Sequence, residues 1–157
     1  LRYAAINGFE YNPPKKHPFN PLAALRMSLK EVSGSNQLGV IDAIFKGGWR
    51  QGADLGDLYS LKALLAKHFI DGENLIQKIS ESEIKDLLIN ETSNAIEKGV
   101  FGVPTIIIDD NLFWGNDQMN HIELLLDGKD PLDKTKLNEE ERPRAIDRKA
   151  FKKQNKE

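Results

Sequence analysis

Two short stretches contain residue types that could bind a small polar ligand. Pro104 precedes a run of β-branched residues, Thr105 to Ile108, and because proline cannot donate a ladder hydrogen bond, it fits the first residue of a strand. Asn116 and Asp117 precede a helical pattern, where free N–H groups favour an anion and a carboxylate could pair with an ammonium group. From spacing alone, both stretches also fit structural roles: a trans proline that begins a strand and a simple helix cap.

Composition excludes several other kinds of site. The chain has no cysteine, which rules out disulfides, thiolate zinc sites and a cysteine nucleophile within it and favours a reducing compartment such as the cytoplasm. The three histidines, His17, His68 and His121, form no metal-spaced pair, so we expect no metal site. A net charge of −2 gives no general case for nucleic-acid binding. No apolar run approaches the roughly 18 residues that a membrane helix needs.

Apolar residues at spacings of three and four predict that residues 1–98 are helical. Asn20 and Pro21 open one helix, as N-cap and first helical residue, and Gly34 ends it. The next helix has a predicted apolar stripe of Leu38, Ile41, Phe45 and Trp49. This helix should stop near Gly47, Gly48 and Gly52. A third helix follows Asp57 with the stripe Leu58, Leu61, Leu65 and Phe69. The spacing Ser80-x-x-Glu83 predicts a capping box for the last helix, which Lys98-Gly99 closes.

The pattern then changes from helical to extended. Val103 to Ile108 should form a strand, residues 109–111 a turn, residues 112–114 a second strand, and residues up to Gly128 a helix. A two-stranded hairpin is marginal alone, and residues 1–8 read as the end of a helix. We therefore expect the chain to be a fragment or a trimmed chain, with further strands upstream of Leu1.

Three regions follow from this pattern: a helical domain over residues 1–98, a hairpin and helix over residues 99–128, and a charged tail over residues 129–157. The tail has ten Lys and Arg against seven Asp and Glu. Its composition is typical of a mobile or helical surface extension, and a partner-binding arm is the alternative.

The order of these segments resembles that of one family. A helical block is followed by Gly-Val-Phe-Gly-Val-Pro-Thr at residues 99–105, by a hairpin, and by Phe-Trp-Gly-Asn-Asp at residues 113–117. The chain is similar to the 2-hydroxychromene-2-carboxylate isomerases and the related kappa-class glutathione transferases, and the resemblance covers residues 1–128. It implies an α/β, thioredoxin-like (DsbA-like) fold with an inserted helical domain, of which this chain has the helical part and the C-terminal hairpin and helix.

The resemblance also implies a glutathione site at Val103, Pro104, Asn116 and Asp117. In such a family the Val103–Pro104 bond is cis, and the main chain of Val103 is open to an extended peptide-like ligand, which docks as if adding a strand. N–H groups near Asn116 would hold the γ-glutamyl carboxylate of glutathione, and Asp117 its ammonium group. This chain has Gln118 where the family usually has arginine, which puts a local role of that arginine in doubt.

Other roles lie outside this site or outside the chain. The resemblance implies a substrate-side role for Asn20, and Trp49 is a further substrate-side candidate, although helix capping and core packing account for these residues as well. The family's catalytic serine belongs to an N-terminal βαβ unit that would precede Leu1, so we expect no catalytic residue in this chain. We interpret its serines as caps or surface residues, at positions 28, 33, 35, 60, 80, 82 and 93.

The resemblance thus predicts a glutathione-dependent isomerase or transferase that acts on aromatic or conjugated keto acids, as a cytoplasmic homodimer with no nucleic-acid or membrane partner. Two alternatives stay open. One is a DsbA-like thiol–disulfide oxidoreductase with Cys-x-x-Cys upstream of Leu1. The sequence Trp114-Gly115-Asn116-Asp117 favours the isomerase over this alternative. The other is a non-catalytic, thioredoxin-like binding module.

Overall fold

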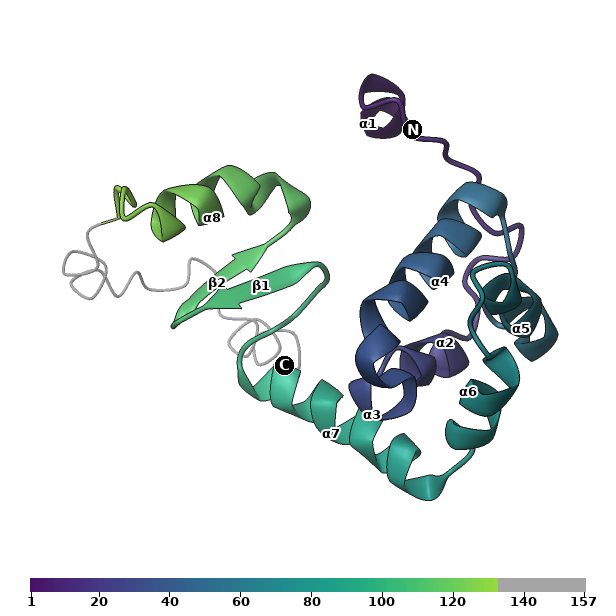
Figure 1. The fold of residues 1–157 in the computed structure, drawn as a ribbon. Coiled ribbons are helices and arrows are strands. Elements are labelled where there is room, and N and C mark those ends of the chain that lie inside the picture. The colour runs from purple at the N-terminus through teal and green to yellow at the C-terminus, as the bar shows by residue number, and fades with distance from the viewer. Residues whose placement is uncertain (133–157) are drawn as a thin grey trace, which may run out of the picture. The chain divides into compact units, whose positions relative to one another are not determined.

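The chain divides between Phe101 and Gly102 into two units (Figure 1). The protein's structure is a computed structural model that describes residues 1–132. Most of the predicted tail, residues 133–157, lies outside the described residues.

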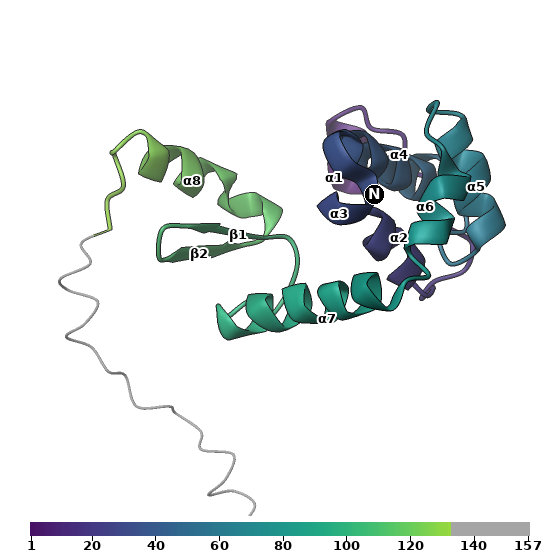
Figure 2. The same cartoon turned by 60° about the horizontal axis from the view of Figure 1, so that its bottom comes forward.

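Within the described residues, the first unit contains helices and no strand. Its first four helical segments are α1 (Arg2–Ile6), α2 (Leu22–Met27), α3 (Lys30–Ser33) and the short 3-10 turn η1 (Gly34–Asn36). The others are α4 (Gln37–Gln51), α5 (Leu58–Ala66), α6 (Gly72–Lys78) and α7 (Ser82–Glu97). Figure 2 shows α2 to α6 gathered into one cluster, from which α7 leads away. The predicted helical nature of this region is therefore correct.

One predicted feature of the first helices needs correction. The single helix expected from Asn20 to Gly34 is broken into α2 and α3, because Leu29 has an extended backbone with ψ 143°. Ser28 ends α2 and donates its hydroxyl to the Ala24 carbonyl at 2.9 Å. Gly34 does end α3, with the positive φ of 59° that glycine adopts most easily.

The apolar face predicted for α4 is wrong. Its buried residues are Val40, Ala43, Ile44, Gly47 and Gly48, whereas the predicted stripe includes Leu38 and Phe45, which are 81% and 62% exposed. The helix also continues through both glycines to Gln51. A methyl carbon added at Gly47 would lie 2.2 Å from Leu64 of α5, and one at Gly48 would lie 2.6 Å from Leu55. The two glycines therefore permit close packing and do not end the helix.

The core of the first unit lies where these helices meet. Met27, Leu61 and Leu65 are fully buried there. The rest of the buried cluster is Ala24, Val32, Val40, Ala43, Ile44, Leu55, Leu64, Leu75, Ile79 and Ile84. Of the stripe predicted for α5, Leu61 and Leu65 are buried, while Leu58 and Phe69 are exposed.

Short polar side chains set several helix ends. Asp57 caps α5 by accepting from the Ser60 N–H at 2.8 Å, as predicted, and Asp71 caps α6 by accepting from the Asn74 N–H at 3.1 Å. The capping box predicted at Ser80 is wrong, because the Ser80 hydroxyl donates to the Ile76 carbonyl at 3.0 Å and α7 begins later, after Glu81.

An ion pair ties α5 to α6. Lys62 donates to Glu73, and this hydrogen bond, together with the negative charge of Glu73, raises the pKa of Lys62 above its ordinary value. Both side chains are about half exposed, so the pair adds little to stability.

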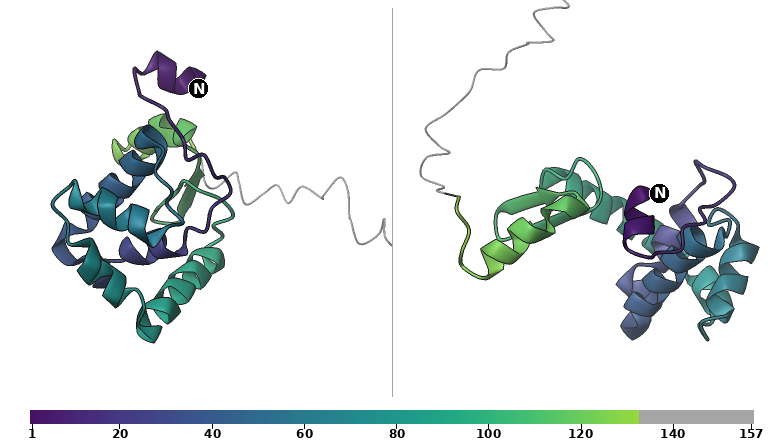
Figure 3. Two further views of the ribbon diagram at one scale, coloured as in Figure 1. Left: turned by 90° about the vertical axis from the view of Figure 1, so that its right-hand side faces the viewer. Right: turned by 90° about the horizontal axis from the view of Figure 1, so that it is seen from above.

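The second unit is a β-hairpin with a helix. Strands β1 (Thr105–Ile108) and β2 (Asn111–Trp114) pair antiparallel, with Thr105 opposite Trp114 and Ile106 opposite Phe113. The 3-10 turn η2 (Asn116–Gln118) leads into α8 (Met119–Leu126), which lies along the hairpin (Figure 3). The first strand thus begins two residues after the predicted Val103. No helix in residues 1–132 is both long and apolar enough to cross a membrane.

The packing of α4 predicts opposite effects for two glycine substitutions. Gly47→Ala should lower the free energy of unfolding by about 1–2 kcal/mol, because overpacking against buried Leu64 outweighs the gain in helix propensity. Gly39→Ala in the same helix is the matched control. Its methyl group would meet only the end of the exposed Asn36 side chain, which can turn away, so stability should rise by up to about 1 kcal/mol. Urea unfolding followed by circular dichroism measures both, and a Gly47→Ala protein as stable as the parent would contradict the packing.

Candidate functional site

The residues predicted to bind a ligand in the second unit meet at the open end of the hairpin. The Gly115 N–H donates to the Pro104 carbonyl at 3.0 Å, one step beyond the Thr105–Trp114 pair. This bond brings Val103 and Pro104 next to the turn that contains Asn116 and Asp117. We call these four residues the hairpin-end site.

Val103 is exposed, and its main chain is unpaired within the described residues. Its residue surface is 88% exposed, and among the described residues neither its N–H nor its carbonyl has a hydrogen-bond partner. The Val103–Pro104 peptide bond is cis, as the resemblance implies. The segment before it is anchored, because the Thr105 hydroxyl donates to the Gly102 carbonyl at 2.6 Å. A donor and an acceptor are thus available at the start of β1.

Gly102 and Gly115 allow the chain to take this course. A methyl carbon at Gly102 would lie 2.6 Å from the indole nitrogen of Trp114, so the main chain runs directly against that ring. Gly115 has φ 107° and ψ 153°, a region open essentially to glycine alone. A methyl carbon there would lie 2.3 Å from Oδ1 of Asp117. The sequence Trp-Gly-Asn-Asp therefore needs its glycine for backbone shape and for room beside the carboxylate.

Asn116 and Asp117 lie inside the 3-10 turn η2 and do not occupy an N-cap position. Gly115 precedes η2 and Gln118 precedes α8, and neither makes a side-chain cap hydrogen bond. The simple capping interpretation of Asn116 and Asp117 is therefore wrong. The turn leaves the Asp117 side chain exposed at the start of the helical segment.

A row of hydrogen bonds orients the Asp117 carboxylate. The Gln118 side-chain NH₂ group donates to Oδ2 of Asp117 at 3.2 Å. The side-chain oxygen Oε1 of Gln118 lies 3.0 Å from Nδ1 of His121. For this contact to be a hydrogen bond, Nδ1 of His121 must carry the proton. Gln118 thus holds Asp117 by a hydrogen bond from an uncharged donor, where an arginine would form an ion pair. Sequence reasoning missed His121, although its spacing of three from Gln118 places both on one helix face.

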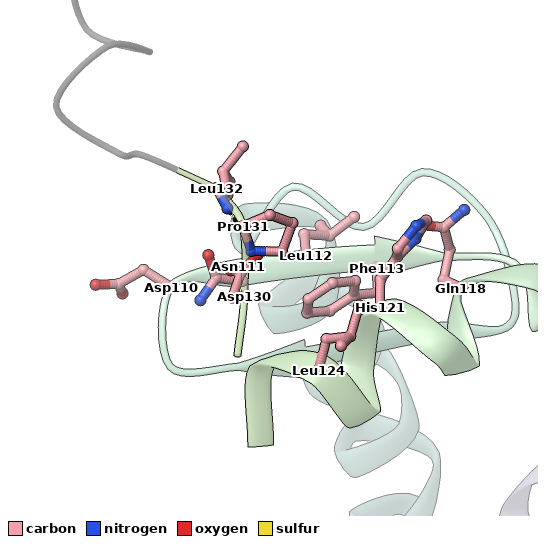
Figure 4. A pocket seen from close by; sticks show the side chains of 10 residues that line it. All are labelled: Asp110, Asn111, Leu112, Phe113, Gln118, His121, Leu124, Asp130, Pro131 and Leu132. Atoms are coloured by element: carbon pink, nitrogen blue, oxygen red, sulfur yellow. Dashed lines mark hydrogen bonds between the residues drawn. The ribbon is translucent and has the colours of Figure 1, made fainter. Parts of the chain in front are cut away.

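A cavity of about 520 Å³ lies between β2 and α8 (Figure 4). Phe113 and Leu124 form part of its wall, Gln118 and His121 stand at one end, and Asp110 and Asn111 at the other. None of the four residues of the hairpin-end site lines this cavity. The hairpin-end site and this cavity therefore share no lining residue.

The two substrate-side candidates belong to the first unit. The N-cap residue of α2 is Pro21 and not Asn20 as predicted. Asn20 precedes it, accepts from the Leu22 N–H at 3.1 Å, and lines a cavity of about 330 Å³. Trp49 packs instead on the preceding loop: its ring is stacked on Tyr11 with centroids 6.4 Å apart and lies 6.3 Å from His17. Trp49 does not line the cavity of Asn20, so the structure does not bring these two residues together in one pocket.

Polar residues elsewhere in the described chain mostly have structural roles. Ser28, Ser33 and Ser80 each donate to a carbonyl of the preceding helical turn, in line with their interpretation as structural serines. No group of His, Asp or Glu side chains within residues 1–132 could hold a metal ion. Arg26 and Lys85, which line the Asn20 cavity, were missed. Arg26 follows Leu22 by four residues in the helix that Asn20 opens, so helical spacing would have placed it on the same face.

Comparisons with known proteins agree with this architecture. The profile of the family described as "DSBA-like thioredoxin domain" matches residues 1–127. A protein of Pseudomonas putida named 2-hydroxychromene-2-carboxylate isomerase is 32% identical over 84 residues, which cover 53% of this chain and 41% of that protein. One of the same name from Pseudomonas sp. (strain C18) is 33% identical over 89 residues, covering 56% of this chain and 42% of that protein.

A solved structure resembles the fold. It is titled as selenomethionine 2-hydroxychromene-2-carboxylate isomerase, and it superimposes with a TM-score of 0.67 at 26% identity, covering 81% of this chain and 62% of that chain. The matches thus span about two fifths of the length of the curated relatives.

The backbone at Gly115 predicts an unequal cost for two glycine substitutions. Gly115→Ala should lower the free energy of unfolding by about 2–3 kcal/mol, because a residue with a side chain is strained at φ 107° and its methyl group would displace Asp117. Gly128→Ala is the control. It also has a positive φ, of 67°, but faces open space, so its cost should be about 1 kcal/mol. Chemical unfolding of both variants measures the difference, and equal costs would show that the contact with Asp117 does not matter.

Proposed function

The chain belongs to the DSBA-like thioredoxin domain family, and on this premise we propose that it is part of a glutathione-dependent isomerase of the kappa glutathione transferase type. The substrates would be aromatic or conjugated keto acids. Support comes from relatives named 2-hydroxychromene-2-carboxylate isomerase, from a solved structure titled with the same name, and from the Gly-Val-Pro and Trp-Gly-Asn-Asp sequences of the hairpin-end site.

The observation that supports glutathione most directly is the open main chain of Val103. An extended peptide can pair with such a donor and acceptor as an added strand. Glutathione has a peptide backbone of this kind. The unpaired N–H and carbonyl of Val103 are therefore suited to the cysteinyl part of glutathione.

The charged end of glutathione fits the turn beside Val103. A γ-glutamyl group has one carboxylate and one ammonium group. The N–H groups of η2 and the first turn of α8 would hold the carboxylate, since a helix start favours negative charge. The Asp117 carboxylate would hold the ammonium group, and the hydrogen bond from Gln118 keeps it oriented.

The chain's own residues bind and orient the cofactor in this proposal. When bound, glutathione would supply a thiolate, which adds reversibly to a conjugated double bond, permits rotation about it and leaves unchanged. A serine hydroxyl outside this chain would stabilise the thiolate. Asn20 and Trp49 stay substrate-side proposals, Trp49 on weaker grounds because its ring packs on Tyr11. The homodimer and the cytoplasmic location stay predictions of the resemblance.

Glutathione-dependent isomerisation by the natural full-length protein tests the proposal. The reaction of an aromatic conjugated keto acid should require glutathione, and S-methylglutathione, which has no thiol, should not replace it. Asp117→Asn should raise the KM for glutathione about tenfold and change the rate at saturating glutathione little, because the lost interaction is a charge-assisted hydrogen bond to a part of glutathione that does not react.

Asp110→Asn is the matched control. Asp110 lies in the turn at the opposite end of the hairpin, so this substitution removes a carboxylate from the same unit without touching the hairpin-end site. Its KM for glutathione should equal that of the parent. Equal KM values for the Asp117→Asn and Asp110→Asn proteins would refute the binding role of Asp117, and isomerisation without glutathione would refute the function.

A further inference from the structure

The cavity between β2 and α8 has apolar walls and two polar ends. Its volume of about 520 Å³ is within the range of small-molecule sites. The apolar lining comes from β2, α8 and the segment that follows α8: Leu112, Phe113, Leu124, Pro131 and Leu132. Gln118 and His121 stand at one end, and Asn111 and Asp130 at the other (Figure 4). We call it the β2–α8 cavity.

The polar ends present hydrogen-bond acceptors without internal partners. Oδ1 of Asp130 accepts from the Leu132 N–H at 3.0 Å, and Oδ2 has no partner among the described residues. The Asn111 NH₂ group donates to the Ile108 carbonyl at 3.2 Å, which leaves its side-chain oxygen as an acceptor. At the other end, Nδ1 of His121 faces Gln118, so Nε2 of the neutral ring is an acceptor as well.

The charge of the lining is negative. Among the described residues, no lysine or arginine lines the cavity. Lys129, which precedes Asp130, pairs with Asp127 at 3.0 Å, and Asp130 takes part in none of the ion pairs within residues 1–132. Asp130 also follows the end of α8, where the helix dipole adds partial negative charge. The cavity therefore favours a cation.

A ligand can reach these groups from solvent. His121 is exposed, and Asn111 and Asp130 are half-buried. Leu124 and Leu132 are 37% and 49% exposed, so a ligand that covers them gains from burial of apolar surface. The side chain of Asp110, which also lines the cavity, points away from the apolar residues (Figure 4) and is not needed for this arrangement.

We propose that the β2–α8 cavity binds a small organic cation with an apolar body, such as an arylalkylamine, and that the Asp130 carboxylate accepts from its ammonium group. A charge-assisted hydrogen bond of this kind is among the stronger ones. Asn111 would accept a second N–H of the ammonium group, and the aromatic body would lie against Phe113 and Leu124. His121 would accept from a donor at the far end of the ligand. None of these residues belongs to the hairpin-end site, so the inference goes beyond the proposed function.

Isothermal calorimetry with tyramine, without glutathione and in mildly alkaline buffer, tests the site. Tyramine has an ammonium group, an aromatic body and a hydroxyl donor, and histidine of ordinary acidity is neutral in such a buffer. Tyrosol, in which an uncharged hydroxyl replaces the ammonium group, should bind at least about tenfold more weakly than tyramine. Ethylamine, which has no aromatic body, should also bind more weakly. Equal affinity for tyramine and tyrosol, or no binding of tyramine at millimolar concentration, would overturn the proposal.

Two variants locate the binding. Asp130→Asn should weaken tyramine binding about tenfold and leave tyrosol binding unchanged, because it removes the charge but keeps an oxygen for the Leu132 N–H. Glu123→Gln is the matched control, since it removes an exposed carboxylate of α8 that does not line the cavity. It should bind tyramine as the parent does.

Circular dichroism confirms that both variants are folded. Equal tyramine affinity of the Asp130→Asn and Glu123→Gln proteins would refute the site. Because no glutathione is present, this result is independent of whether glutathione binds Val103 and Asp117.

Discussion

The hydrogen bond from Gly115 to Pro104 determines what the second unit can do. It closes the hairpin one residue beyond the Thr105–Trp114 pair and sets the start of β1 beside the turn that leads into α8. With it, an open peptide edge and a carboxylate lie next to each other, which is the combination that a peptide with a charged amino end requires.

The same bond depends on a glycine. At φ 107° and ψ 153°, Gly115 turns the chain so that its N–H meets Pro104 and leaves room for the Asp117 carboxylate. Gln118 then orients that carboxylate without neutralising it. With glutamine where the resemblance implies arginine, Asp117 forms none of the ion pairs of the described residues, while a hydrogen bond still keeps it in position.

Features set by neighbours in sequence were predictable. The cap at Asp57, the end of α3 at Gly34 and the hairpin follow from local chemistry. Features set by neighbours in space were not. The stops predicted at Gly47 and Gly48 failed because these residues make room for Leu64 and Leu55, which lie elsewhere in the chain.

The candidate sites divide in the same way. Asn116 and Asp117 were found from their sequence context, although the context suggested a cap and the structure has a 3-10 turn. Arg26 and Lys85 are far apart in sequence and have no motif. Only the packing of α2 against α7 places them in the cavity beside Asn20. This cavity could therefore be found from the structure and not from the sequence.

The most direct test of the central claim is an amide NMR titration of the protein with reduced glutathione. If the main chain of Val103 pairs with glutathione, the Val103 amide signal should shift with the same saturation curve as that of Asp117, and its exchange with solvent should slow. Shifts confined to other parts of the chain, with the Val103 amide unchanged at saturating glutathione, would contradict the account.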